Sequence, residues 1–192
     1  KIAEQRLAEK WDHFEKLDLI PTELFPDGND MRPRTYGMPR WCDLFTPRQL
    51  LGHLTLMEGL HNLKPQILET LGPERGKAVI TYLQFAIDKG LDYNSRQTRW
   101  EYTRGIVKGT FGRHDFSFKW TFGEMVFAGP ASGAAWGLSQ IVDAYAGMAD
   151  LTTNAPTETA CQIINGSGSQ MSHVADESVD LVVNDPPYYN NV

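Results

Sequence analysis

The residues best suited to chemistry stand near the end of the chain, in the tetrapeptide Asp185-Pro186-Pro187-Tyr188. An aspartate carboxylate can accept a hydrogen bond from an amino group, and the Pro186 carbonyl can accept another because proline restricts the backbone. The Tyr188 ring offers a face for stacking on a nucleobase turned out of its helix. These residues suit methyl transfer to an exocyclic amine, which depends mainly on positioning. The alternative is a rigid turn, since Asp and Pro are common turn formers.

The element that must position this tetrapeptide is the short run directly before it. Residues 178–183 are apolar and β-branched, a pattern typical of a strand in the middle of a parallel sheet. Ligands of open α/β sheets bind at the carboxyl ends of such strands. We therefore expect a strand over 178–183 that delivers Asp185 to a binding cleft, and this context favours catalysis over a simple turn.

Three stretches carry a resemblance to a known family, namely residues 40–51, residues 114–120, and residues 163–168 together with 178–189. They resemble amino-group methyltransferases that depend on S-adenosylmethionine, whose fourth motif is Asp/Asn/Ser-Pro-Pro-Tyr/Phe/Trp. In particular, they look like one group of large adenine-specific DNA methylases of bacteria and archaea that carry a DUF1156 domain. The resemblance implies transfer of a methyl group to the N6 amine of adenine in DNA.

The same resemblance implies a fold and a set of site residues. The expected fold is α/β, a partial Rossmann-like methyltransferase sheet with a large, mainly helical insertion. Asp185, Pro186, Pro187 and Tyr188 would be catalytic. The residues expected to line the S-adenosylmethionine pocket are Phe45, Thr46, Pro47 and Ser167. Glu124 lies in a segment that the family shares, but the sequence assigns it no role.

The family's glycine-rich cofactor loop is expected on the N-terminal side of these stretches and is not found here. We therefore expect a fragment, inactive alone, whose partners are DNA and the remainder of the same polypeptide. The turn at residues 127–133 is a weaker candidate for the loop, because Pro130 removes a backbone amide. Two alternatives stay open: methylation of amines in RNA bases or protein, and a non-catalytic nucleic-acid docking or scaffold fragment.

Composition narrows the class of protein. Hydrophobic residues make up 41% of the chain, in the range of globular proteins, and no apolar run is long enough to cross a bilayer. Two cysteines, Cys42 and Cys161, suit a reducing compartment, so we expect a cytoplasmic protein without a membrane partner. They cannot supply Cys-x-x-Cys pairs and the five histidines lack ligand spacing, so no metal is expected.

Basic and aromatic residues are interleaved over residues 96–122, although the net charge of the chain is −6. This composition is typical of nucleic-acid surfaces. The alternative is a solvated face beside ordinary core aromatics. Residues 32–48 hold a second group of arginines.

Local patterns predict the remaining elements. A first helix should end near Leu17, followed by a proline-rich loop over 21–39. A second helix should begin with Thr46 as its N-cap, and a third should run from Gly72-Pro73 to Gly90. Alternating aromatics predict a strand over 116–122, and a helix should include Leu138 and Tyr145. The expected organisation is helix and linker (1–45), helical insertion (46–150) and methyltransferase core (151–192).

Overall fold

The computed structural model describes residues 1–26, 32–112, 116, 118–153 and 163–185. Its elements are, in chain order, α1 (Ile2–Lys16), α2 (Arg32–Thr35), the 3-10 helix η1 (Trp41–Leu44), α3 (Pro47–Tyr93), β1 (Arg99–Glu101), β2 (Ile106–Lys108) and α4 (Gly133–Thr152). The chain divides into two compact units, Lys1–Gly147 and Met148–Val192.

Helix α1 forms where helical spacing places Leu7, Trp11 and Phe14 on one face, which confirms the first predicted helix. This face packs on the start of α3, and Phe14 is fully buried there. Lys10 and His13 both bind the Glu58 carboxylate, at 3.0 and 2.6 Å, and so fix α1 against α3. The hydrophobic core at this contact contains Leu7, Phe14, Ile20, Cys42, Leu50 and Leu54.

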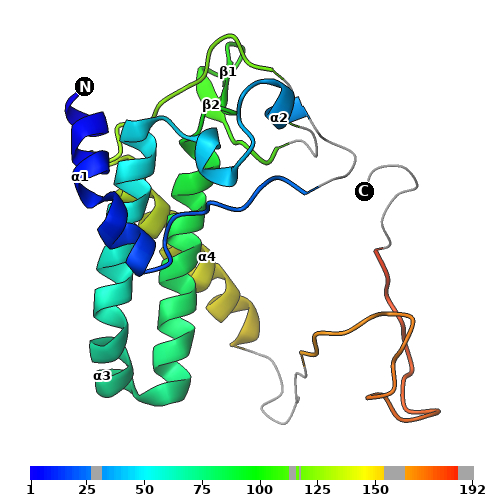
Figure 1. Ribbon diagram of the computed structural model, residues 1–192. Helices are drawn as coiled ribbons and strands as arrows, with labels where there is room; N and C mark the ends of the chain where they lie inside the picture. The colour runs from blue at the N-terminus through cyan, green and yellow to red at the C-terminus, as the bar shows by residue number, and fades with distance from the viewer. Residues whose placement is uncertain (27–31, 113–115, 117, 154–162, 186–192) are drawn as a thin grey trace. The chain divides into compact units, whose positions relative to one another are not determined.

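Helix α3 begins as the sequence predicts, because Thr46 and Gln49 form a reciprocal capping box and Pro47 follows the cap. The helix is interrupted at Gly72, whose φ of 75° and ψ of 169° are accessible almost only to glycine. Pro73 then starts a second arm that runs back beside the first (Figure 1). The predicted break is confirmed, but the predicted end at Gly90 is wrong, since the helix continues to Tyr93.

The segment between α1 and α3 is anchored by a second small core of Phe25, Met38 and Leu44. An isolated bridge joins Leu24 to Arg40, and the Arg40 guanidinium donates to the Thr22 carbonyl. The described residues of this connection therefore pack beside η1.

Strands β1 and β2 form an antiparallel hairpin in which Trp100 faces Val107 across the strands. Helix α4, predicted from its apolar spacing, packs on the second arm of α3 through Tyr93–Trp136 and Tyr82–Tyr145 ring contacts at 5.1 and 5.3 Å. Among the described helices, none combines the length and the apolar character that a membrane crossing requires.

The expected α/β fold is wrong. The described residues are mostly helical, and their only sheet is the two-stranded antiparallel hairpin, so they contain no Rossmann-like parallel sheet. The mainly helical part of the expectation fits. The described residues of 116–122 and all of 178–183 form no strand. A strand is stable only where a neighbouring strand completes its backbone hydrogen bonds. No described strand pairs with these two segments, so their apolar pattern does not produce a strand.

The described part of the second unit contains the end of α4 and, over residues 163–185, only turns and bends. Nearly every side chain in residues 163–185 is exposed, including those of Val179, Leu181 and Val183. An apolar run of this kind does not form a core by itself.

Candidate functional site

Three residues expected to line a cofactor pocket lie together at the junction between η1 and α3. They are Phe45, Thr46 and Pro47. The Thr46 hydroxyl accepts a hydrogen bond from the Gln49 amide at 3.2 Å, and the Gln49 side chain accepts one from the Thr46 amide at 2.9 Å. The Phe45 ring packs against both small cores and meets the His53 ring edge-on, with centroids 5.2 Å apart. Two of the three residues are thus engaged in capping and packing.

A buried polar network lies one turn into α3, and the sequence did not reveal it. The His53 ring Nε2 lies 3.0 Å from the Asn94 carbonyl oxygen, and the Gln49 amide donates to the Asn94 side-chain oxygen at 3.4 Å. That oxygen also accepts from the Met125 backbone amide at 3.1 Å. The network therefore joins the start of α3, and Asn94 directly after its end, to Met125. Burial lowers the pKa of His53, although the bond to the Asn94 carbonyl partly opposes this.

Glu124, whose role could not be assigned from the sequence, forms a bidentate ion pair with Arg48 on the first turn of α3. The two nitrogen–oxygen distances are 2.5 and 2.8 Å. The Glu124 carboxylate raises the pKa of the Arg48 guanidinium through hydrogen bonding and charge. The two residues are 76 positions apart, so no local pattern could have indicated the pair.

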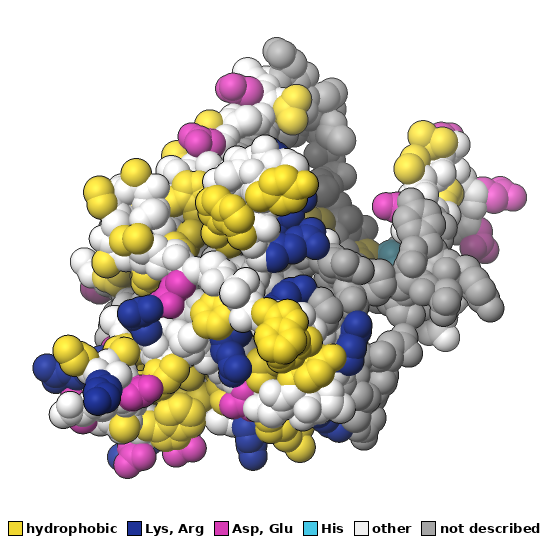
Figure 2. Space-filling model, turned by 90° about the horizontal axis from the view of Figure 1, so that it is seen from above, with side chains coloured by type: hydrophobic (Ala, Val, Ile, Leu, Met, Phe, Trp, Pro, Cys, Tyr) yellow, Lys and Arg dark blue, Asp and Glu magenta, His cyan; other side chains and the backbone are white. Residues whose placement is uncertain are grey.

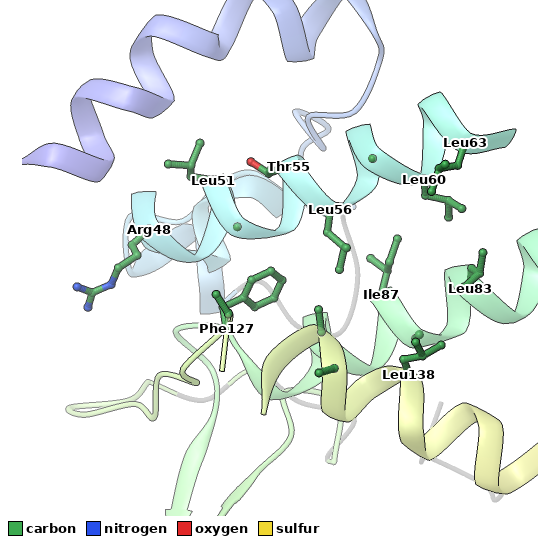
Figure 3. Close-up of a pocket in the computed structure, with 16 residues that line it drawn as sticks. Arg48, Leu51, Thr55, Leu56, Leu60, Leu63, Leu83, Ile87, Phe127 and Leu138 are labelled. Atoms are coloured by element: carbon green, nitrogen blue, oxygen red, sulfur yellow. The ribbon is translucent and has the colours of Figure 1, made fainter. Parts of the chain in front are cut away.

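A cavity with a volume of about 690 Å³ lies between the two arms of α3 and α4. Figure 3 shows Leu56, Ile87 and Phe127 pointing into it from three different segments. Apart from Arg48 and Thr55, its walls are apolar or glycine. A second cavity of about 340 Å³ is lined by Arg48, Asn94, Glu124 and residues 125–127.

These cavities do not fit S-adenosylmethionine as they stand. The cofactor carries a carboxylate, an ammonium group and a ribose diol, which require several polar partners, whereas the larger cavity is almost entirely apolar. In the smaller one the Glu124 carboxylate already binds Arg48. The hydroxyl of Thr46 is engaged in the cap. Neither cavity therefore offers a complete set of partners for the cofactor.

The predicted catalytic residues lie in the second unit. Asp185 is exposed, at the end of the exposed run 179–183, and it lines neither cavity. Pro186, Pro187 and Tyr188 lie outside the described residues. Ser167 is exposed as well, and its hydroxyl lies 2.9 Å from that of Ser169. Asp185 and Ser167 thus belong to one unit, and Phe45, Thr46 and Pro47 to the other.

Potential metal ligands are scattered. In the part of the chain that the structure describes, no three His, Cys, Asp or Glu residues gather in a way that could hold a metal ion. Cys42 is buried, and burial together with the nearby Asp43 charge raises the pKa of its thiol. Cys161 and His114 lie outside the described residues.

The basic and aromatic residues of 96–122 do not form an ordinary core. Trp100, Tyr102 and Trp120 are 62, 86 and 90% exposed, and Phe111, Phe118 and Phe122 are exposed too. Of the predicted alternating aromatics, only Phe116 is half-buried, against Phe25 and Trp41. Sequence composition identified this surface, but not the hairpin that displays much of it.

Comparisons with known proteins add no family to this picture: no family model, no curated protein and no solved structure matches the chain.

Proposed function

We propose that this chain is part of an enzyme that transfers a methyl group from S-adenosylmethionine to the N6 amine of adenine in DNA. The observation that carries the proposal is the apolar run 178–183 leading into Asp185-Pro186-Pro187-Tyr188. Asp185 is exposed and hence accessible to a base. The proposed setting is the cytoplasm.

In this proposal the part played by Asp185 follows from the weakness of the nucleophile. The lone pair of the adenine amine is delocalised into the ring. A carboxylate that accepts a hydrogen bond from this amine favours a more tetrahedral nitrogen, with its lone pair aimed at the methyl donor. Asp185 is the proposed acceptor, the carbonyl of Pro186 is the second, and Tyr188 supplies the stacking ring.

The exposed apolar run before Asp185 supports the proposal that another polypeptide segment covers this part of the second unit. Val179, Leu181 and Val183 leave apolar surface in water, and burying a side chain of this kind contributes roughly 1.5–3 kcal/mol. We propose that the remainder of the same polypeptide covers this run and carries the glycine-rich cofactor loop. The incomplete cofactor fit of the described residues agrees with such a division.

The test is methyl transfer from labelled S-adenosylmethionine by the full-length protein on adenine-containing DNA. Asp185→Ala should lower the rate by about a hundredfold or more, because the amine loses its positioning group. The matched control is Asp180→Ala, which removes another exposed carboxylate from the same run. Unchanged methylation in Asp185→Ala, with circular dichroism identical to that of the wild type, would refute the role given to Asp185.

Two rival functions are separated by the choice of substrate. Transfer to RNA or to protein, in place of DNA, would keep the chemistry and change the acceptor. Absence of transfer to all three would favour the non-catalytic alternative, which the exposed aromatic and basic residues of 96–122 also support. Calorimetry of the 192-residue chain with S-adenosylhomocysteine should show weak or no binding, and micromolar binding would place the cofactor site within this chain.

A further inference from the structure

We infer that the hairpin β1–β2 and the segment beside it bind single-stranded DNA by stacking its bases on exposed rings. The surface, here called the aromatic-basic face, consists of Trp100, Tyr102, Arg104, Phe118 and Trp120. It would be the nucleic-acid contact of the enzyme proposed above, and the choice of DNA over RNA rests on that proposed function.

The two parts of the face are held together by direct contacts. The Thr98 hydroxyl accepts from the Gly123 amide at 2.9 Å and donates to the Gly123 carbonyl at 2.8 Å. A Cβ atom placed on Gly123 would lie 2.8 Å from the Val107 side chain, so the segment passes directly against the hairpin. Val107 pairs with Trp100 across the strands, and paired residues share one side of a hairpin.

The rings of the aromatic-basic face contact neighbouring rings and yet stay exposed to solvent. Phe118 meets Tyr36 on one side and Trp120 on the other, each with centroids 5.0 Å apart and edge-on geometry. Trp120 nevertheless stays 90% exposed, and Tyr102, in the turn of the hairpin, is 86% exposed. Large aromatic surface left in water at this density marks an interaction site.

The charge of the face selects an anionic partner. Residues 96–119 contain six basic and two acidic residues, although the whole chain has 18 basic and 24 acidic ones. Lys108 binds Glu101 within the hairpin and neutralises that carboxylate. Arg99 and Arg104 form no ion pair with any residue that the structure describes. Figure 2 shows dark blue Lys and Arg side chains between yellow hydrophobic ones on this side of the molecule.

The form of nucleic acid follows from the rings. Inside a duplex the faces of the bases are already stacked on each other, so protruding rings gain contacts only with bases that are free of the stack. The guanidinium of Arg104, in the exposed turn of the hairpin, can bind a phosphate of the same strand. A single strand satisfies both requirements, because it carries unstacked bases next to a phosphate at every nucleotide.

The experiment is fluorescence anisotropy of the 192-residue chain with a labelled 20-nucleotide DNA strand, its duplex, and the RNA of the same sequence, without cofactor. The single DNA strand should bind more tightly than the duplex. Trp120→Ala and Trp100→Ala should each weaken it about five- to a hundredfold, and Trp120→Phe much less. Arg104→Ala should reduce the salt dependence by about 0.7 in slope.

The matched controls remove an exposed ring and an exposed arginine from elsewhere in the same unit. Tyr145→Ala on α4 and Arg6→Ala on α1 should leave affinity unchanged. Duplex binding as tight as single-strand binding, binding to RNA alone, binding of neither strand, or equal losses in the controls would each overturn the inference. The binding assay contains no cofactor and measures no methyl transfer, so loss of methylation and loss of binding are separate results.

Discussion

The two units of the chain differ in how they cover their apolar side chains. In the first, Phe14 and Leu54 are 0 and 1% exposed, whereas in the second Leu181 and Val183 are 76 and 84% exposed. A helix satisfies its backbone internally and needs only one neighbouring face to bury its apolar stripe. A strand leaves its amides and carbonyls open until another strand lies beside it. A helical pattern in the sequence therefore predicts its element more reliably than a strand pattern does.

The hydrogen bonds of polar groups also differ between the two units. The first unit contains the buried contacts of Gln49, His53 and Asn94, which join residues 41 to 45 positions apart. In residues 163–185 the hydrogen bonds are short in range, such as Ser178 to the Ala175 carbonyl. Asp185, the one described residue of the predicted catalytic set, thus lies in a segment without long-range hydrogen bonds among the described residues.

Hydrogen exchange gives the largest expected contrast between the units. Amides of residues 50–54 should exchange at least roughly a thousandfold more slowly than those of 179–183, because only the former need substantial unfolding of the unit to open. Mass spectrometry of the deuterated 192-residue chain measures both. Strong protection at 179–183 in this chain would mean that the run is already paired, and the comparison of the units would be broken.

Truncation of apolar side chains should follow the same division. Phe14→Ala should lower the free energy of unfolding by about 3–5 kcal/mol, since it leaves a cavity between α1 and α3. Val183→Ala should change it by less than about 0.5 kcal/mol, because the side chain already faces water. Urea unfolding followed by circular dichroism compares the two variants. Equal losses of unfolding free energy in the two variants would show that the Val183 side chain is buried in solution.

What the sequence could predict depended on the range of the interaction involved. The cap at Thr46 and the break at Gly72 are decided within a few residues, so both were predicted correctly. The expected strands failed because their existence depends on partners far along the chain. The pair of Arg48 with Glu124 and the Asn94 network left no local pattern. Of the candidate site, the sequence predicted the capping role of Thr46 but not the packing of Phe45 against the two cores and the His53 ring.

His53 makes the stability of the first unit depend on pH. Its Nδ1 is buried without a hydrogen-bond partner, and the Phe45 and Phe127 rings lie on either side. A proton there would place a charge in apolar surroundings, so the folded-state pKa lies below the unfolded value of about 6.5. The unfolded chain therefore binds more protons, and stability present above about pH 6.5 is lost as pH falls toward the folded-state pKa.

Substitution of two histidines isolates this effect. Between about pH 7.5 and 5, the wild type and His61→Gln should lose stability alike, since His61 is exposed, whereas His53→Gln should lose less. Hydrogen bonds from Lys10 and His13 lower the pKa of Glu58, so its carboxylate contributes stability that is lost only at lower pH. Chemical unfolding at each pH measures the slopes, and a parallel pH profile in His53→Gln would assign the dependence to another group.

The smallest expected effects come from two glycines of α3 that differ in backbone conformation. Gly72→Ala should destabilise the first unit by about 1–3 kcal/mol, because its φ of 75° is strained for any side chain. Gly59→Ala should stabilise it by about 0.5–1 kcal/mol, since Gly59 is helical and a Cβ there meets no atom within 4 Å. Thermal unfolding measures both. If the two changes had the same sign, the turn at Gly72 would not be what holds the arms of α3 side by side, and the order of the first unit would have to come from its core contacts alone.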